Sequence, residues 1–344
     1  MSFLKKLNYA VGVFAIAMVL IASPVLAKNH IHINGQLTAG SWEEKSGIQI
    51  APIYLDSPDS SLNFLSLDEA TKSGVIEVTE TGSVNELVVE NQGRRPILLL
   101  AGEVVSGGKQ DRMVGKDMIL GPGKTRKINV FCVEHGRWTP SAEKERFKSS
   151  SMMADQSIRQ TAQGRGGNSE NQGAVWHEVA KAIDGYKVAA PTQNYQEIKK
   201  SEKFKDSEAI ARYFISAFFK DDAIAGFAVA YNGEIQSLEY FANPAMASKY
   251  KDKLIRSYVA SAFKNLEESK PLGLDEVKDF ANETLSKETH QYQTEDDITI
   301  ESRSDNIQSF ELATPKLRTV HYARYLGEGP KETIKGNRYR PGND

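Results

Sequence analysis

The stretch of residues 84–138 most constrains the fold, because short apolar runs alternate in it with turn-forming clusters. The apolar runs cover 87–89, 97–101 and 128–133, and the turns are Asn91-Gln92-Gly93, Gly107-Gly108 and Gly121-Pro122-Gly123. This alternation is typical of strands joined by turns. No segment between the runs is long enough for a crossover helix, so the strands must pair as an antiparallel sheet. We expect either a β-sandwich or an open barrel.

The first 27 residues have the features of a secretory signal peptide. Lys5 and Lys6 give a positive start, residues 11–21 are apolar, and Val25-Leu26-Ala27 is a small-residue cleavage site. The apolar run is shorter than the roughly 20 residues that cross a bilayer, which favours cleavage after Ala27 over a retained anchor. We therefore expect export to the periplasm or the extracellular space, without stable membrane insertion after cleavage.

The chain after the signal has a nearly balanced charge and one cysteine. Loss of Lys5 and Lys6 changes the formal net charge from −2 to −4, which indicates neither a nucleic acid nor an anionic membrane as partner. A disulfide framework within this sequence is excluded, because Cys132 is its only cysteine. Cys132 lies in an apolar run, so we expect burial, which would protect an exported thiol from oxidation.

The second half of the chain shows helical signals followed by late strands. Thr139-Pro140 predicts a helix start, with the helix continuing through 141–163, whereas the polar, glycine-rich residues 164–173 predict a flexible surface loop. Asn232-Gly233 between two apolar runs predicts a tight hairpin. Further helices are expected at 174–183, 206–220, 244–266 and 274–286, and strands at 298–302, 309–313 and 317–326.

These patterns predict an α+β fold in two parts. An antiparallel β unit, either sandwich or open-barrel-like, is expected over residues 28–137, with one short helix that Ser66 and Glu69 begin as a capping box. An α+β unit with the hairpin and the late strands is expected over 138–326, followed by a loose tail at 327–344. The two units either are separate domains or form one continuous body.

Charged residues surround the Gly107-Gly108 turn. Glu103 closes an apolar strand before the turn, and the next segment opens with Lys109, Gln110, Asp111 and Arg112. A hairpin is expected to bring Glu103 close to Lys109 and Asp111. Such a cluster can perform acid–base chemistry, bind a cation or orient a phosphate, and the glycines let backbone N–H groups approach an anion. The alternative is a solvated salt-bridge cluster on an exposed hairpin.

A second polar strand end follows Cys132. Glu134, Arg137 and Trp138 bring together a carboxylate, a guanidinium and an indole, which would suit a nucleobase, a sugar or an acidic ligand. The alternative is an Arg–Trp stack at the junction of the two units. We expect no metal site, because the sequence has neither HExxH nor a paired Cys/His array. It also shows no evident partner for His321.

The chain resembles a known family, the ARG and rhodanese-phosphatase-superfamily-associated protein domain, first type, in the segments VNELVVEN, LLLAGE, GGKQDR, PGK and CVEHGRW. The resemblance is strongest over residues 67–138 and continues to about residue 326. It implies a link to NAD or ADP-ribose metabolism but no defined activity. The pattern of that family matches Glu103, Gly107, Gly108, Lys109, Gln110, Asp111 and Arg112, then Cys132, Glu134, Gly136, Arg137 and Trp138.

Three functions are compatible with these residues. The first is binding of a small anionic or nucleotide-like ligand such as ADP-ribose, with the lysine and arginines of the two polar clusters holding the anion and Trp138 stacking on it. The second is hydrolysis of a nucleotide or ADP-ribose-like ester with Glu103 or Asp111 as general base. The third is a purely structural role, in which the motifs lock the β unit against the helical unit. The sequence identifies no cofactor and no oligomeric state.

Overall fold

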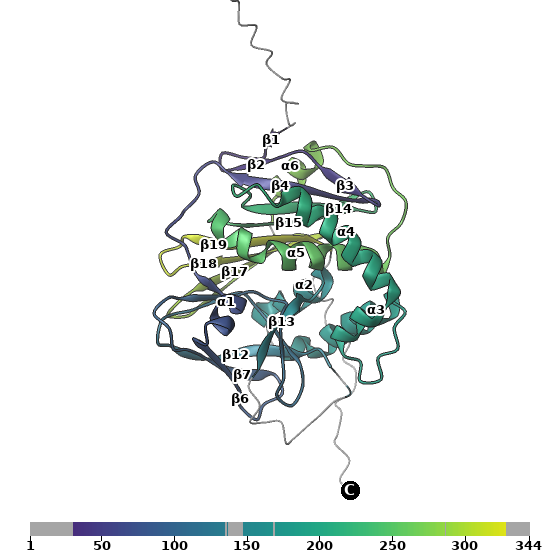
Figure 1. Cartoon of the computed structure of the whole chain (residues 1–344). Coiled ribbons are helices and arrows are strands. Elements are labelled where there is room, and N and C mark those ends of the chain that lie inside the picture. The colour runs from purple at the N-terminus through teal and green to yellow at the C-terminus, as the bar shows by residue number, and fades with distance from the viewer. Residues whose placement is uncertain (1–29, 135, 137–146, 168, 286, 328–344) are drawn as a thin grey trace, which may run out of the picture.

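The computed structural model describes residues 30–134, 136, 147–167, 169–285 and 287–327. It confirms the α+β class, because helices pack against mainly antiparallel sheets (Figure 1). One long helix lies in the middle of the molecule, with a large sheet on one side and a smaller, curled β unit on the other (Figure 1). Three of the four largest apolar clusters in the described part of the chain lie within these layers or between them.

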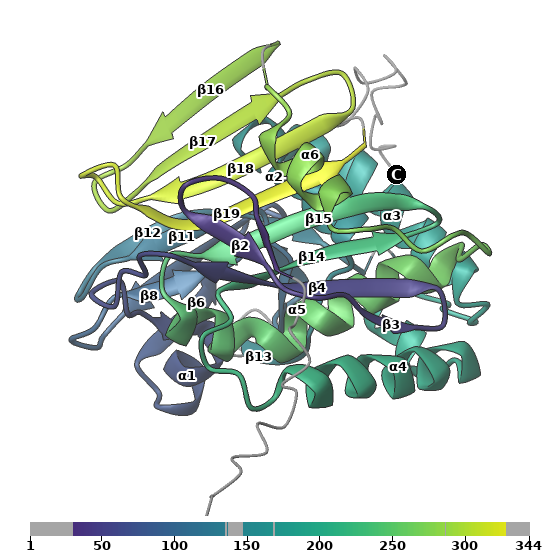
Figure 2. The ribbon, with the colours of Figure 1, turned by 90° about the horizontal axis from the view of Figure 1, so that it is seen from above.

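The largest sheet has ten strands in the order β1-β2-β4-β14-β15-β19-β18-β17-β16, with β3 paired to β4 (Figure 2). It takes strands from both sides of residue 138, so the boundary expected from the sequence crosses this sheet. The strands are β1 Ile31–His32, β2 Leu37–Ala39, β3 Glu43–Lys45, β4 Ile48–Leu55, β14 Gly226–Tyr231, β15 Glu234–Phe241, β16 Glu288–Gln293, β17 Ile298–Arg303, β18 Ile307–Ala313 and β19 Thr319–Leu326.

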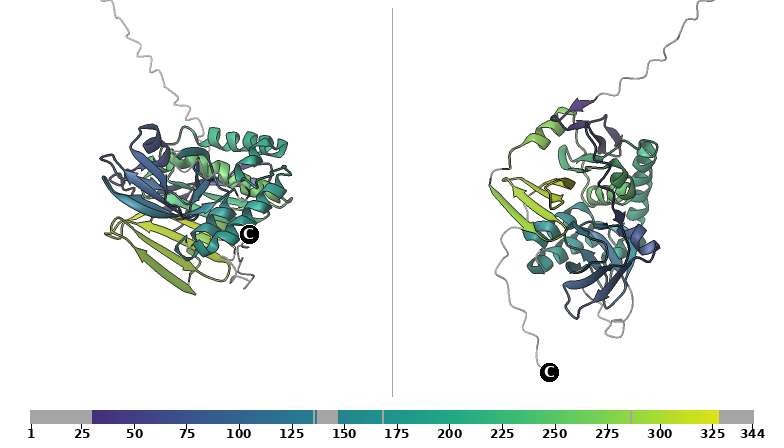
Figure 3. Two further views of the ribbon diagram at one scale, coloured as in Figure 1. Left: turned by 90° about the horizontal axis from the view of Figure 1, so that it is seen from below. Right: turned by 90° about the vertical axis from the view of Figure 1, so that its left-hand side faces the viewer.

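The smaller β unit is a curled half-barrel (Figure 3). It combines a six-stranded sheet of order β13-β9-β10-β12-β7-β6 with a three-stranded sheet of order β11-β8-β5. Of the two forms expected for this region, the open barrel is therefore the closer description. The strands are β5 Leu65–Ser66, β6 Ile76–Glu80, β7 Glu86–Asn91, β8 Ile97–Leu99, β9 Glu103–Ser106, β10 Arg112–Val114, β11 Met118–Leu120, β12 Thr125–Cys132 and β13 Lys148–Met153.

Helix α5, Pro244–Lys264, is the central helix between the two β units (Figure 3). It begins as the sequence predicts, because Pro244 occupies the first turn and the Asn243 side chain accepts a hydrogen bond from the Ala245 N–H at 3.0 Å. Its apolar residues join one core with β4, β8 and α4. The remaining helices are α1 Leu67–Lys72, α2 Gln156–Gly167, α3 Gln172–Gly185, α4 Glu202–Phe218 and α6 Asp275–Asn282, with 3₁₀ helices η2 Ser169–Asn171 and η3 Tyr195–Lys200.

Two local predictions from turn chemistry are confirmed. Ser66 caps α1 and exchanges hydrogen bonds with Glu69 as a capping box. Asn232 and Gly233 have φ values of 56° and 76° and connect β14 to β15 as a tight hairpin. Among the residues described, no helix combines the length and the apolar character that crossing a membrane requires.

The helix expected over 141–163 is wrong at Lys148–Met153, and residues 141–146 lie outside the described part of the chain. Residues Lys148–Met153 form β13, which pairs antiparallel with β9, and α2 begins only at Gln156. The helix starts there because the Asp155 carboxylate accepts hydrogen bonds from the Ile158 N–H and the Ser157 hydroxyl. Strand pairing overrides the absence of proline and glycine in this segment. The Thr139-Pro140 signal lies outside the described residues.

The flexible loop expected over 164–173 is also wrong for the residues that the structure describes. They form the end of α2, the 3₁₀ helix η2 and the start of α3. Gly166 has φ +68° and its Cα faces the ring of Tyr292 so closely that a Cβ would meet that ring at 2.8 Å. The glycines here end a helix and permit close packing, which a polar composition alone does not reveal.

Candidate functional site

The β9–β10 hairpin separates the two residues that the sequence suggested as catalytic. Arg112 pairs with Val105, so Asp111 lies at the turn and Glu103 at the far end of β9. Three residues along a strand span about 10 Å. The expectation that Glu103 lies close to Lys109 and Asp111 is therefore wrong. The turn after β9 is longer than a two-residue hairpin and shifts which residues face each other.

Asp111 and Glu134 converge, and together they hold the segment 192–196. The Asp111 carboxylate accepts hydrogen bonds from the side-chain amides of Asn194, at 3.1 Å, and Gln196, at 2.7 Å. Glu134 accepts one from the Thr192 hydroxyl at 3.2 Å and one from the Asp111 N–H at 3.4 Å. The two acidic residues are only 5% and 3% exposed. They therefore position the chain that leads into η3.

The backbone N–H groups at the Gly107-Gly108 turn are used within the chain. The N–H of Gly107 donates to the Asp111 carboxylate at 3.2 Å, and that of Lys109 donates to the Glu80 carboxylate at 2.9 Å. Gly108 has φ +55°, and a Cβ there would meet Glu80 Oε1 at 2.7 Å. Glycine thus lets Glu80 approach the turn. The protein itself supplies the anions that these N–H groups bind.

Gln110, Arg112 and Cys132 form a buried group. Arg112 donates to the Gln110 side-chain oxygen at 3.2 Å and to the Val84 carbonyl at 3.0 Å. The Cys132 thiol donates to the same Gln110 oxygen at 3.1 Å, and burial raises its pKa to about 11. The expected burial of Cys132 is confirmed. Arg137 and Trp138 lie outside the described residues.

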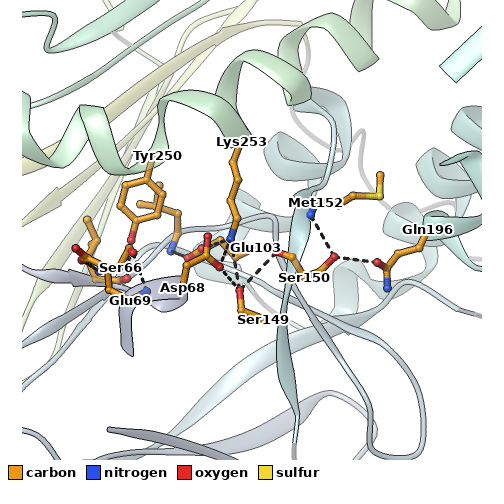
Figure 4. Close-up of polar contacts among 12 residues, drawn as sticks. Ser66, Asp68, Glu69, Glu103, Ser149, Ser150, Met152, Gln196, Tyr250 and Lys253 are labelled. Atoms are coloured by element: carbon orange, nitrogen blue, oxygen red, sulfur yellow. Dashed lines mark hydrogen bonds and ion pairs between the residues drawn. The ribbon is translucent and has the colours of Figure 1, made fainter. Parts of the chain in front are cut away.

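Glu103 belongs to another polar group, the Lys253 cluster, formed by Asp68, Glu103, Ser149 and Lys253 (Figure 4). The Lys253 ammonium lies 2.7 Å from Asp68 Oδ1 and 3.2 Å from Glu103 Oε1. The Ser149 hydroxyl donates to Asp68. The second Glu103 oxygen accepts a hydrogen bond from the Leu100 N–H at 3.0 Å. Residues from α1, β9, β13 and α5 meet in this cluster.

The charges of the Lys253 cluster compensate each other. Burial raises the pKa of Glu103, although the Lys253 ammonium acts against it. Burial alone would lower the pKa of Lys253, but the Glu103 and Asp68 carboxylates outweigh it and raise that pKa. Lys253 is therefore protonated at neutral pH and cannot take a proton from Ser149. The arrangement does not form a serine nucleophile activated by a lysine base.

A cavity of about 280 Å³ lies where β13, η3, α4 and α5 meet. Gln196 connects it to Asp111, because its side-chain amide donates to the Asp111 carboxylate at 2.7 Å. The side-chain oxygen of Gln196 accepts hydrogen bonds from Ser150 at 2.8 Å (Figure 4) and from Lys199 at 3.3 Å. The polar residues of the lining are Ser151, Lys199, Glu208 and Arg256, and the others are Met152, Met153, Tyr195, Phe204 and Ala260.

The lining of this cavity carries two cations and one carboxylate. Arg256 forms an ion pair with Glu208. Burial lowers the pKa of Lys199, and the carboxylates of Asp111 and Glu208 offset this effect only in part. Lys199 is thus the one cation of the lining that the Arg256–Glu208 pair leaves over, and it stands beside an apolar wall, an arrangement that can bind a small anion. Among the described residues, no group of three or more His, Cys, Asp and Glu side chains could hold a metal ion.

A further charge network, the His321 network, joins the two β units in the interior. The His321 ring lies 2.7 Å from Asp117 Oδ2 and 3.0 Å from Glu239 Oε1. Arg159 donates to both Glu239 oxygens, and the Tyr258 hydroxyl donates to one of them at 2.6 Å. Asp117 comes from the half-barrel, whereas Glu239 and His321 come from the large sheet. His321 thus has two carboxylate partners that the sequence did not reveal.

The sequence patterns did not predict Lys199, Arg256, the Lys253 cluster as a whole or the His321 network. One signal was present for Lys253, because it lies beside Tyr250 and Leu254 on the predicted helix 244–266. A charge within an apolar stripe of a helix indicates a buried partner. Lys199 carried no comparable signal, since it lies in a run of polar residues.

These features define an α+β protein in which a half-barrel and a ten-stranded sheet enclose one central helix, with a small cationic cavity at its side. The family model of the ARG and Rhodanese-Phosphatase-superfamily-associated Protein domain matches residues 36–325, so the chain belongs to this family. The comparison with curated proteins gave no match, and neither did the comparison with solved structures.

Proposed function

We propose that this chain is an exported binding protein for a small anionic ligand, which occupies the cavity lined by Lys199 and Arg256. The observation that carries the proposal is the position of Lys199 and Arg256, which line one cavity together with apolar side chains. Lys199 is exposed at the mouth of the cavity, and desolvation lowers the pKa of its ammonium more than the nearby carboxylates raise it. A bound anion would add a negative charge beside this ammonium and so stabilise its charged form.

The family motif residues have a positioning role in this proposal. Asp111 and Glu134 hold Thr192, Asn194 and Gln196, and the chain then enters η3, which carries Lys199. Held in this way, η3 presents its cation to the cavity without a rearrangement on binding. Preorganisation of this kind improves affinity, because less conformational freedom is lost when the ligand binds.

The size of the cavity restricts the ligand. A volume of about 280 Å³ is just below the usual range of roughly 300–1,000 Å³ for ligand pockets. A carboxylate or phosphate with a short apolar part would fit it, with the anion at Lys199 and the apolar part against Met152 and Phe204. An ADP-ribose-like ligand would place only its phosphorylated end in the cavity.

The geometry favours binding over the hydrolytic alternative through Glu103 and Asp111. Glu103 begins β9, whereas Asp111 lies in the turn that follows this strand, and each carboxylate accepts hydrogen bonds from the chain itself. A general base must lie within hydrogen-bond reach of the proton that it takes. Hydrolysis that survives Glu103→Gln and Asp111→Asn together would exclude this pair as the base.

Lys199→Met is expected to weaken anion binding by ten- to a hundredfold, because a hydrogen bond to a charged group contributes about 1.5–3 kcal/mol. The free protein should lose no stability. The folded-state pKa of Lys199 lies below its ordinary value, so the unfolded chain binds this proton more tightly and the ammonium opposes folding at neutral pH. Calorimetry with phosphate, acetate, ribose 5-phosphate and ADP-ribose, together with urea unfolding, measures both effects.

Lys200→Met is the matched control, because Lys200 is the next residue and its side chain is 68% exposed in an ion pair with Glu197. It should leave anion affinity unchanged. Equal losses of affinity in both variants would show that general charge attraction, not this cavity, holds the anion. A wild-type protein that binds none of the four anions would contradict the proposed function.

Export is tested on the protein from its own cells. Cleavage after Ala27 predicts a mature chain that begins at Lys28 and is found outside the cytoplasm. Cell fractionation followed by mass spectrometry of the intact protein measures both properties. An uncleaved chain in the cytoplasm would contradict export while leaving the anion site untouched.

A further inference from the structure

An acidic groove of about 600 Å³ runs between α6 and the strand ends of β15 and β19, and it shares no lining residue with the cavity of Lys199. Its walls carry four carboxylates, and no lysine or arginine is among the described residues that line it. Its apolar residues include Ile235, Phe280 and Leu326. The lining carboxylates belong to Glu234, Glu276, Asp279 and Glu283.

These carboxylates are not neutralised by the groove itself. Glu234, Glu276 and Asp279 are exposed, and none of them forms an ion pair with the residues that the structure describes. Glu283 accepts a hydrogen bond from the Ser304 hydroxyl at 3.2 Å. Like charges gathered on one surface repel each other, so a cationic occupant would relieve this repulsion.

Arg324 is a buried cation beside Phe280 on the floor of the groove, and it donates its hydrogen bonds to the backbone. It is only 3% exposed, and its guanidinium lies 5.4 Å from the centre of the Phe280 ring. It donates to the carbonyls of Ala281 and Glu283. These contacts fix the C-terminal end of α6, and they leave the carboxylates on the groove walls facing solvent.

The chain that follows Leu326 has a complementary composition. Leu326 lines the groove, and Lys331 follows five residues later. A fully extended chain of this length spans at most about 17 Å, so Lys331 lies within that distance of Leu326. Residues 331–340 contain one acidic residue, Glu332, and the apolar side chains Ile334 and Tyr339. Their four cations are Lys331, Lys335, Arg338 and Arg340.

We propose that residues 331–340 bind in this groove of the same chain, with their cations at the carboxylates and their apolar side chains on the floor. The sequence by itself predicts a loose tail at 327–344, because nothing in its local pattern forms a helix or strand. The groove supplies the tertiary contact that the local pattern lacks. This assignment is independent of the proposed anion site.

Limited proteolysis of the full chain tests the proposal, because trypsin cleaves after Lys331, Lys335 and Arg338. In the wild type these bonds should be cleaved at least tenfold more slowly than in a synthetic peptide of residues 328–344. A variant with three groove acids neutralised, Glu234→Gln/Glu276→Gln/Asp279→Asn, should lose this protection. Sodium chloride at 1 M should also remove it, since the screening length then falls to about 3 Å.

The control variant Glu267→Gln/Glu268→Gln/Asp275→Asn changes the net charge by the same amount at exposed positions outside the groove lining. It should keep the wild-type protection. The proposal is overturned if the wild type is cleaved as fast as the free peptide, or if the control loses protection as fully as the groove variant. Protection that increases with protein concentration would also overturn it, because the tail would then bind a second copy.

Discussion

Glu239→Gln is expected to lower the free energy of unfolding by about 3–5 kcal/mol, the usual cost of removing one partner from a buried ion pair. Glu239 is 1% exposed and accepts hydrogen bonds from Arg159 and Tyr258 beside His321. Burial alone would raise the pKa of Glu239, but Arg159 and His321 outweigh it and hold that pKa well below its ordinary value. Without the Glu239 carboxylate, Arg159 would lose its buried ion pair and His321 would keep only Asp117 of its two carboxylate partners.

The His321 network also predicts how stability depends on pH. Burial alone would lower the pKa of His321, but the Asp117 and Glu239 carboxylates raise it from the ordinary 6.5 to about 9. The folded state therefore holds this proton more tightly than the unfolded state does. The stabilisation is complete below about pH 6.5 and is lost as the pH rises to 9, an effect on the order of 3 kcal/mol.

Urea unfolding at several pH values measures both effects. Glu202→Gln is the control for the mutation, because Glu202 pairs with Lys205 on the surface, where the two side chains are 83% and 65% exposed. Its expected cost is at most about 1 kcal/mol. If Glu239→Gln costs no more than this control, or if the wild type is as stable at pH 9 as at pH 6.5, the charge assignment of the network is wrong.

Lys253→Met is expected to cost about 3 kcal/mol or more, because it leaves Glu103 buried without its cation. Glu103 is 0% exposed, and among the residues that the structure describes its carboxylate accepts hydrogen bonds from the Leu100 N–H and the Lys253 ammonium. Since burial already raises the pKa of Glu103, this carboxyl can take up a proton. The destabilisation should therefore shrink as the pH falls toward 5.

Lys249→Met provides a matched control one helical turn earlier on α5. Lys249 pairs with Glu69, whose side chain is 42% exposed, at 2.8 Å, so the expected cost is about 1 kcal/mol. Adding Glu103→Gln to Lys253→Met should recover most of the loss, because no buried charge then remains unpaired. An equal loss in both lysine variants, without recovery in the double variant, would show that packing of the side-chain stems dominates.

Predictions that depend on a few neighbouring residues agree with the structure. The capping box of Ser66 and Glu69 and the Asn232-Gly233 hairpin need only residues within a few positions of each other. Predictions that extend over a longer segment are wrong in part. The region expected to be one helix over 141–163 contains β13, because its pairing with β9 outweighs local preference.

The candidate site divides in the same way. The sequence identified Asp111 and Glu134 as polar residues at strand ends, and the structure brings them together through Asn194 and a hydrogen bond from the Asp111 N–H to Glu134. The sequence could not identify Lys199 as a neighbour of Asp111 and Glu134, because Lys199 lies more than 60 residues further along the chain. Spacing along the chain contains no information about which distant loop covers a strand end.

By its local patterns, the sequence alone determined that residues 84–132 form antiparallel strands, that Cys132 is buried, and that Gly107-Gly108 makes a polar turn. Only the tertiary structure decided that this turn binds the protein's own carboxylates, that Glu103 turns toward Lys253, and that a cationic cavity forms beside α5. The physical reason is the separation along the chain of the residues that interact. Turns and caps are set by dihedral preferences and by hydrogen bonds between near neighbours, whereas cavities and buried ion pairs depend on which distant surfaces pack together.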